Sequence, residues 1–314
     1  ESAWVPPLRY QTEGPFLVAA YGAMSGVDIF YWFATDQIGF GPPMEKWQLS
    51  TPAQIGMFPA AAMMFRQGYI RQGKPALVES RSLSDVFNRK PPRLPEEAGF
   101  DPNRDIQSRF ATSAEAARQG TITSLAYLAA PVEVAFDDGE TQLADISSLI
   151  ETEKQTVRSI TGELNWNYGD GYCTLNTAKA QGATGYLAGA GTIKLDMLTL
   201  RCDNDYATVL AVSMDGVNLS ESKQVLLQIG TVARPHGWKT EPAQGGKSQR
   251  IVNLGSSPWN IENTSAELTL SNVRLRQATS LDANGIATAD LPVQKNADGL
   301  SLKLPPNALY ILLR

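Results

Sequence analysis

The chain has 314 residues, of which 43% are hydrophobic and 19% are charged, and this is the composition of a folded globular protein rather than of a disordered chain. A chain of this length suits about two domains. Its 27 basic and 32 acidic residues give a net charge of −5, which argues against nucleic acid as a partner because nucleic acids attract basic faces. No apolar run reaches the length of about 18 residues that a membrane-spanning helix needs.

The start of the chain has the pattern of an α/β unit. Gly14-Pro15 predicts the beginning of a helix over about 14–25, because proline suits the first helical turn. The run VDIFYWFA predicts a buried strand over 27–34, since a strand that is covered on both faces is almost continuously apolar. A second helix is predicted over 58–71. Helix, strand, loop and helix in this order indicate the end of an α/β domain.

The pattern changes to short β-strands after Lys74. PALVESRSL and VEVAF look like strands, and the proline-rich stretch between them is interpreted as an ordered loop or insertion. Further strand-like runs follow, separated by the turn signals NYGDG, AGAG, DNDY, MDGVN, LDANG, NADG and PPN. Short strands with such turns predict a mainly antiparallel β-sandwich region. We therefore expect residues 120–314 to contain no helix longer than about three turns.

The opening stretch ESAWVPPLRYQTEGPFLVAAYGAMSGVDIFYWF resembles the last part of the catalytic barrel in clan A glycoside hydrolases. The stretches GELNWNYGDGYCTLNT, AQGATGY and YATVLAVSMDGVNLSESKQVLLQIG resemble the accessory β-domain of such enzymes, in which a serine-bearing turn leads into a strand. The resemblance implies a mixed fold, with the final α/β elements of a TIM barrel followed by a β-sandwich region. Residues 1–73 would end the (β/α)8 barrel, 74–120 would be a linking strand and loop insertion, and the accessory region would span 74–314.

The resemblance implies a retaining glycoside hydrolase that cleaves a polysaccharide or oligosaccharide by double displacement, secreted or periplasmic, with no cofactor and no metal. The acid/base carboxylate of this clan lies on a barrel strand that is absent from the sequence. The implied partners are thus a carbohydrate substrate and the remainder of the barrel, as an upstream segment or a separate chain. The alternative is a non-catalytic carbohydrate-binding or structural β-sandwich module.

The resemblance gives Glu1 the position of the catalytic nucleophile, at the end of the seventh barrel strand. The competing interpretation is a solvated side chain with no catalytic role. Four aromatic residues are candidate sugar-binding platforms, because the apolar faces of pyranose rings stack on aromatic rings; they are Trp4, Tyr10, Trp32 and Trp47. Trp32 is equally compatible with barrel core, and Trp47 with the cap of a core.

Two carboxylates flank the first predicted helix. Glu13 suits an electrostatic role at the helix N-terminus at least as well as a substrate contact. Asp28, within the predicted apolar strand, needs a partner if it is buried, so a structural pairing is favoured.

Cys173 and Cys202 both lie in strand-like stretches, where a disulfide and two buried free thiols remain open alternatives. With one histidine, His236, the chain almost excludes a cysteine or histidine zinc site. The acids of NYGDG and DNDYA have a composition that calcium accepts, but turn chemistry explains the same residues.

Overall fold

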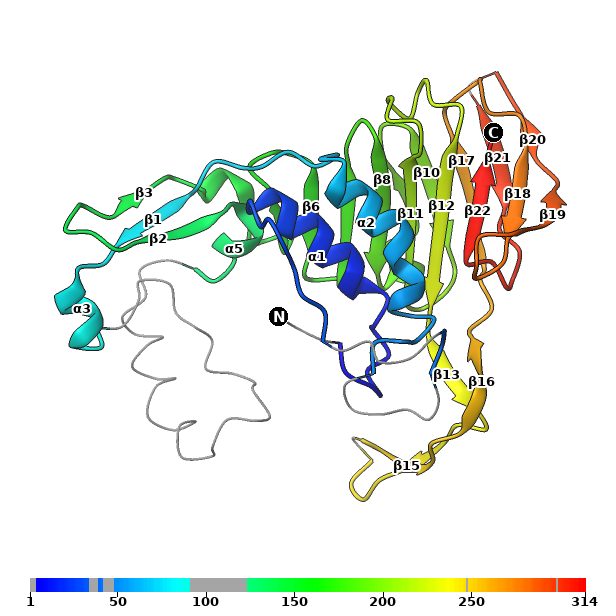
Figure 1. Ribbon diagram of the computed structural model, residues 1–314, viewed down its shortest axis with the longest axis horizontal. Coiled ribbons are helices and arrows are strands. Elements are labelled where there is room, and N and C mark those ends of the chain that lie inside the picture. Colours follow the sequence, from blue (N-terminus) through cyan, green and yellow to red (C-terminus); the bar gives the residue numbers. More distant parts are fainter. Residues whose placement is uncertain (1–3, 34–38, 42–47, 91–122, 247, 298) are drawn as a thin grey trace. The chain divides into compact units, whose positions relative to one another are not determined.

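A computed structural model describes residues 4–33, 39–41, 48–90, 123–246, 248–297 and 299–314 (Figure 1). Two candidate residues of the sequence analysis, Glu1 and Trp47, lie outside this described part, as does most of the expected loop insertion. The chain is a mixed α/β protein that is dominated by antiparallel β-sheets.

The chain divides into two compact units. The larger unit contains residues 1–23, 27–71 and 170–314, and the smaller unit contains residues 24–26 and 72–169. These units do not test the expected division at residue 73. That division stays a prediction.

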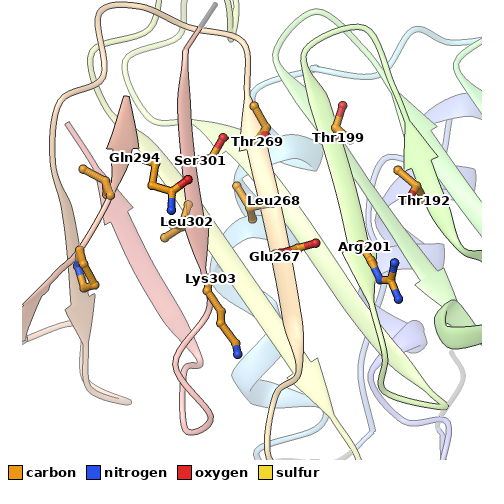
Figure 2. A pocket seen from close by; sticks show the side chains of 12 residues that line it. Thr192, Thr199, Arg201, Glu267, Leu268, Thr269, Gln294, Ser301, Leu302 and Lys303 are labelled. Carbon is orange, nitrogen blue, oxygen red and sulfur yellow. Dashed lines mark hydrogen bonds between the residues drawn. The ribbon is translucent and has the colours of Figure 1, made fainter. Parts of the chain in front are cut away.

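Two antiparallel sheets form a β-sandwich in the larger unit. The first has the order β19-β18-β22-β12-β11-β8-β7, and the second has the order β20-β21-β17-β10-β9. The first sheet is formed by β7 (Tyr172–Asn176), β8 (Ala180–Gly185), β11 (Ala207–Ser213), β12 (Val225–Thr231), β18 (Ala278–Leu281), β19 (Ala287–Leu291) and β22 (Tyr310–Leu313). The second sheet, part of which appears in Figure 2, is formed by β9 (Thr192–Lys194), β10 (Leu198–Cys202), β17 (Ala266–Leu270), β20 (Gln294–Lys295) and β21 (Leu300–Lys303).

The sandwich core is made by the side chains that the two sheets turn toward each other. On β10 and β17 the leucines at alternate positions are fully buried, which is the period of a strand with one covered face. The unit also contains helix α6 (Leu187–Ala190) and two antiparallel ribbons, β13 (Ala233–His236) with β16 (Ser256–Ile261) and β14 (Lys239–Pro242) with β15 (Gln249–Asn253).

Strands β11 and β12 are buried on both faces along their whole length. A layer of helices explains this burial: α1 (Glu13–Met24), the 3-10 helix η1 (Ile55–Met57) and α2 (Phe58–Arg66) lie over the sheet, and α2 packs on β11 and β12 (Figure 1). The helix predicted over 14–25 is thus confirmed. The second helix begins as predicted but ends at Arg66 rather than at residue 71, since Gly68 takes a left-handed conformation with φ of +62°.

The helical layer is attached to the sheet through buried polar side chains. Gln228 on β12 accepts a hydrogen bond from Ala60 N at 2.9 Å through Oε1, and donates one to the Met57 carbonyl at 2.7 Å through Nε2. Ala60 lies in the first turn of α2, where N–H groups lack partners within the helix, and Met57 is the N-cap residue of that helix. The Tyr310 hydroxyl on β22 donates to the Gly56 carbonyl at 2.7 Å.

The predicted buried strand over 27–34 is wrong. In the described part of this segment, residues 27–31 have no regular secondary structure and Trp32 makes an isolated bridge. Asp28 is exposed, so the pairing that was expected of a buried carboxylate is wrong as well. The apolar run reflects side chains that favour burial, but the described residues provide no parallel neighbour on which such a strand would form.

The smaller unit contains a three-stranded sheet of order β2-β1-β3, in which β1 (Leu77–Ser80) pairs in parallel with β2 (Val132–Ala135) and antiparallel with β3 (Gln142–Leu143). β1 and β2 confirm the strands expected in PALVESRSL and VEVAF. The unit also contains α3 (Leu83–Phe87), α5 (Ala126–Ala129), the 3-10 helix η3 (Ser147–Leu149), β4 (Ile150–Glu151), β5 (Thr156–Arg158) and β6 (Leu164–Asn167).

Between residues 123 and 314 no described helix exceeds four residues, which confirms the expectation that this region has no helix longer than about three turns. None of the helices in the described part of the chain has the length and apolar character needed to cross a membrane.

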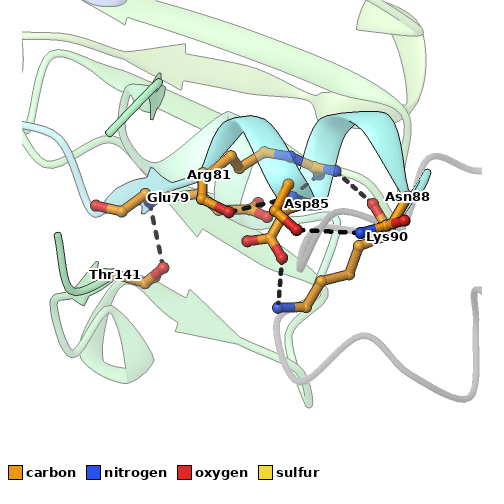
Figure 3. A network of polar contacts seen from close by, with 9 residues as sticks. Glu79, Arg81, Asp85, Asn88, Lys90 and Thr141 are labelled. Atoms are coloured by element: carbon orange, nitrogen blue, oxygen red, sulfur yellow. Dashed lines mark hydrogen bonds and ion pairs between the residues drawn. The ribbon is translucent and has the colours of Figure 1, made fainter. Parts of the chain in front are cut away.

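A polar network orders the end of β1 and the short helix α3 (Figure 3). Arg81 lies 3.4 Å from the Glu79 carboxylate and also donates to the Lys90 carbonyl. Lys90 Nζ lies 3.1 Å from Asp85, and the hydrogen bond that it donates lowers the pKa of Asp85. The Ser82 hydroxyl accepts from Asp85 N at 3.1 Å as the N-cap of α3.

The turn between β11 and β12 depends on one carboxylate. Asp215 accepts hydrogen bonds from the hydroxyls of Ser213 at 2.9 Å and Ser222 at 2.8 Å, and from Lys223 N at 2.8 Å. Desolvation acts to raise the pKa of Asp215, but these hydrogen bonds outweigh it and the net shift is downward. This is the serine-bearing turn that the sequence resemblance singled out.

We expect Gln228→Leu to lower the free energy of unfolding by about 2–4 kcal/mol, because it leaves the buried N–H of Ala60 without this partner and removes the hydrogen bond to the Met57 carbonyl. Chemical denaturation of both proteins measures the difference. Gln224→Leu, at an exposed position just before β12, is the matched control and should change the stability little. Equal stabilities for parent and Gln228→Leu would contradict the anchoring role of this amide.

We expect Asp215 to make stability depend on pH. Its folded pKa is lowered, so its contribution is complete above the unfolded value of about 3.9 and is lost as the pH falls through the lower folded value. Asp215→Asn should therefore destabilise the chain at about pH 6 and make a smaller difference at about pH 3. Denaturant titrations at the two pH values measure this, with Asp138→Asn as an exposed control; an equal effect at both would contradict the assignment.

Candidate functional site

Trp4 is fixed through both its backbone and its ring. Its carbonyl accepts hydrogen bonds from the side-chain amides of Gln11 and Gln54, each at 2.8 Å, and its indole Nε1 donates to Glu13 Oε1 at 2.9 Å. The ring lies directly over Gly14, where an added Cβ would come within 2.8 Å of two indole carbons. Glycine at this position is therefore required by close approach of the ring, in addition to its place at the helix start.

Trp32 lies against Trp4, with ring centroids 6.0 Å apart and planes inclined by 38°. Phe30 and Phe58 extend the cluster, at centroid distances of 5.0 and 5.1 Å from Trp32. The fold thus brings together two of the predicted platform residues from segments that are separate in sequence. Their binding of sugar stays a prediction.

Glu13 connects this aromatic cluster to the β-sandwich. Its carboxylate accepts from the Trp4 indole and, through Oε2, from the Tyr206 hydroxyl. Burial raises the pKa of Tyr206, and the negative charge of Glu13 raises it further, so Tyr206 stays a neutral hydrogen-bond donor. As the first residue of α1, Glu13 also has the favourable position at a helix N-terminus that the sequence predicts.

Tyr10 belongs to a cluster of three tyrosines. Its ring centroid lies 4.6 Å from that of Tyr206 and 5.7 Å from that of Tyr186, and the Tyr186 hydroxyl donates to the Tyr10 hydroxyl at 2.7 Å. This hydrogen bond, together with partial burial, raises the pKa of Tyr186 to about 12. Arg9 lies over the Tyr10 ring at 6.0 Å and forms an ion pair with Asp205 at 2.9 Å. The Tyr10 ring is thus partly covered by protein rings, and its role as a sugar platform stays a prediction.

A small apolar pocket lies beside Trp32, with a volume of about 250 Å³. This is slightly below the range of about 300–1,000 Å³ that is usual for small-molecule sites. Its lining comes from α1, α2 and the segment around Phe30, and includes Pro15, Val18, Phe30, Trp32, Phe58 and Phe65. Among the described residues that line it, Arg66 supplies the charged group, so the pocket suits an apolar group or the apolar face of a ring.

Apolar side chains of the segment beyond α1 are exposed at alternate positions. Val27, Ile29, Tyr31 and Phe33 are 39%, 64%, 71% and 47% exposed, whereas the intervening Phe30 and Trp32 are partly buried in the aromatic cluster. Asp28, between Val27 and Ile29, is exposed as well. Large exposed apolar patches often mark a surface that another molecule or segment covers.

The remaining candidates have structural roles or are exposed. Trp259 on β16 donates its indole N–H to the Gly41 carbonyl at 2.6 Å. His236 is exposed at the end of β13. Among the described residues there is no group of three or more His, Cys, Asp or Glu side chains that could hold a metal ion.

Cys173 and Cys202 are buried free thiols, which decides between the two alternatives of the sequence analysis. Burial raises the pKa of Cys173 to about 12 and that of Cys202 to about 11, so neither thiol forms a nucleophilic thiolate at neutral pH. Neither cysteine is therefore a candidate for covalent catalysis.

Three residues of the candidate site were not predicted from the sequence. Tyr186 and Tyr206 lie after a strand and before a strand, and nothing in the local pattern links either to Tyr10. Gln54 positions the Trp4 carbonyl, and its own Oε1 is buried with no hydrogen-bond partner in the described part of the chain.

Comparisons with protein-family models, curated proteins and solved structures find no match for this chain.

We expect Gly14→Ala to displace the Trp4 ring, because the added Cβ comes within 2.8 Å of two indole carbons. Loss of this packing should lower the free energy of unfolding by about 1–3 kcal/mol and reduce the near-UV circular dichroism of the tryptophans. Gly189→Ala is the matched control, since a Cβ added at Gly189 would have no other atom within 4 Å and an alanine fits there without contact. An unchanged near-UV spectrum in Gly14→Ala would contradict the close packing of Trp4 on the helix start.

Proposed function

We propose that this chain is the C-terminal part of a retaining glycoside hydrolase that acts on a polysaccharide or oligosaccharide outside the cytoplasm. In this proposal, residues 1–73 complete a catalytic barrel whose other strands come from polypeptide outside residues 1–314. The observation that carries the proposal is the exposed apolar segment from Val27 to Phe33, because it needs a covering partner.

The exposed apolar side chains of this segment support a missing neighbour. Val27, Ile29 and Tyr31 are exposed, Phe30 and Trp32 are partly buried, and Asp28 is exposed among them. The described part of the segment forms no strand, so the support comes from the apolar side chains that a covering polypeptide would bury. Full burial of each large apolar side chain stabilises a fold by roughly 1.5–3 kcal/mol, so covering four of them would be strongly favourable.

Helix α1 supports the same interpretation. Its sequence EGPFLVAAYGAM is apolar around its whole circumference, which is typical of a helix that is covered on all sides. Phe16, Ala20 and Met24 are fully buried, but Leu17 and Val18 are only partly buried. The uncovered face of α1 therefore has the character of an interface.

The proposal gives the role of nucleophile to Glu1, as the sequence resemblance implies. A nucleophilic carboxylate must be held in place relative to the sugar. In double displacement the Glu1 carboxylate would attack the anomeric carbon, and a second carboxylate about 5–5.5 Å away would protonate the leaving oxygen. That second carboxylate would come from the remainder of the barrel.

A second candidate function is a non-catalytic carbohydrate-binding module. The polar groove on the five-stranded sheet favours it, because this groove lies on β-strands of the chain itself and needs no additional segment. Hydrolytic activity of the full-length polypeptide distinguishes the two functions.

We expect Glu1→Gln in the full-length polypeptide to reduce turnover of its polysaccharide by several orders of magnitude. The amide keeps the shape of the side chain but cannot form the glycosyl-enzyme, so binding should be retained. Release of reducing sugar measures turnover, and proton NMR of the first product reports whether the anomeric configuration is retained.

Glu221→Gln is the matched control, at an exposed glutamate in the turn before β12, and should leave turnover unchanged. Activity of Glu1→Gln within about tenfold of the parent would exclude Glu1 as the nucleophile. An inverted product would exclude double displacement.

A further inference from the structure

The outer face of the five-stranded sheet is hollowed into a polar groove of about 440 Å³ (Figure 2). Its side chains come from β9, β10, β17, β20 and β21, and the stretch before β20 contributes Pro292 and Val293. The volume lies within the range of about 300–1,000 Å³ that is usual for ligand sites. Neither the proposed catalytic site nor the aromatic cluster of Trp4 and Trp32 includes any residue of this groove.

Strand register arranges the groove in two polar rows. In one row, Arg201 on β10 lies opposite Glu267 on β17 in the strand register, and Glu267 lies opposite Lys303 on β21. In the next row Thr199 pairs with Thr269, and Thr269 pairs with Ser301. The second row continues to Gln294 on β20.

The floor beneath the two rows is rigid. The residues that alternate with the polar ones on β10, β17 and β21 are leucines with exposures of 4% or less: Leu198, Leu200, Leu268, Leu270, Leu300 and Leu302. Because they pack into the sandwich core, the outward side chains of the same strands are held at fixed spacing. A preorganised row of donors and acceptors loses little conformational entropy when it binds a ligand.

The groove presents hydrogen-bonding groups with balanced charge. Arg201 pairs with Asp203 at 3.4 Å, so its charge is compensated. The Glu267 carboxylate lies between two cations in the register, yet it makes no ion pair or hydrogen bond with the described residues. It is therefore available as an acceptor, while the Thr269 and Ser301 hydroxyls hydrogen-bond each other at 2.7 Å and keep a free lone pair or proton for a ligand.

The geometry points to this groove as a binding site for a neutral oligosaccharide segment, held edge-on by hydrogen bonds to its hydroxyl groups. The lining carries charges of both signs, with Glu267 between Arg201 and Lys303 in the strand register, and this disfavours a polyanion. The groove also runs across strand faces rather than along an unpaired strand edge, where an extended peptide would add as a strand. A carboxylate, an amide and several hydroxyls are the groups that bind polyhydroxylated ligands through hydrogen bonds. In so far as the ligand is the polymer that the enzyme cleaves, the inference rests on the proposed function.

The test is affinity gel electrophoresis of this chain in gels that contain a soluble galactomannan, xylan or β-glucan, with polygalacturonate as the anionic comparison. The variants are Glu267→Gln, which removes the acceptor charge, and Thr269→Val, which removes a hydroxyl at constant shape. Glu221→Gln, distant from the groove lining, is the matched control. Thermal unfolding of each variant verifies that it is folded.

We expect the parent and Glu221→Gln to be retarded by at least one neutral polysaccharide, and Glu267→Gln to bind it at least about tenfold more weakly. Thr269→Val should also weaken binding. Equal retardation of the parent and both groove variants would overturn the site, and so would the absence of retardation by every neutral polysaccharide. Retardation by polygalacturonate alone would overturn the neutral ligand class.

Hydrolysis is measured separately on the full-length polypeptide, so the two proposals can fail independently. Groove-dependent binding without hydrolysis would reject the proposed enzyme and leave the groove as a binding site. Hydrolysis together with binding that is insensitive to Glu267→Gln would reject the groove and leave the enzyme.

Discussion

The architecture of the larger unit depends on how the backbone groups at the start of helix α2 find hydrogen-bond partners when the helix is buried against a sheet. The first turn of a helix has backbone N–H groups without helical partners, and burying them unpaired would cost about 1–3 kcal/mol each. Gln228, in the middle of a strand that is otherwise apolar, supplies both a donor and an acceptor to this turn. The helical layer can therefore cover β11 and β12, and the position of α1, with Glu13 and Trp4, follows from that layer.

The buried polar groups that attach this helical layer to the sheet have hydrogen-bond partners, whereas apolar side chains of the segment after α1 are exposed to solvent. Toward the sheet, Glu13 holds Trp4 and Tyr206, and Tyr310 holds the Gly56 carbonyl. Ile29 and Tyr31, in the segment that follows α1, are more than half exposed. These exposed apolar side chains are the physical basis for the proposal that another part of a polypeptide covers the segment.

The sequence predicted those features that local chemistry determines. Gly14-Pro15 marked the start of α1, and the turn residues between short apolar runs marked the β-rich region. The strand over 27–34 failed because apolar periodicity reports which side chains favour burial and says nothing about whether a neighbouring strand exists. The end of α2 was missed because Gly68, inside an otherwise helical pattern, adopts a left-handed conformation. The cluster of Tyr10, Tyr186 and Tyr206 was out of reach, since its members are brought together only by sheet register and helix docking.

The two sheets of the sandwich differ in what covers their outer faces, and this difference separates the two proposed sites. The helical layer covers β11 and β12, so every residue of these strands is buried, and apart from Gln228 their residues are apolar or small. The layer of α1, η1 and α2 does not extend to β10 and β17, which keep the alternation of buried leucine and outward polar residue. A ligand that arrives from water can reach hydrogen-bonding groups only on this second face. The first face instead presents, through α1 and the segment after it, apolar surface that suits another part of a polypeptide. The aromatic cluster of Trp4 and Trp32 and the proposed binding groove thus lie on opposite faces of the sandwich.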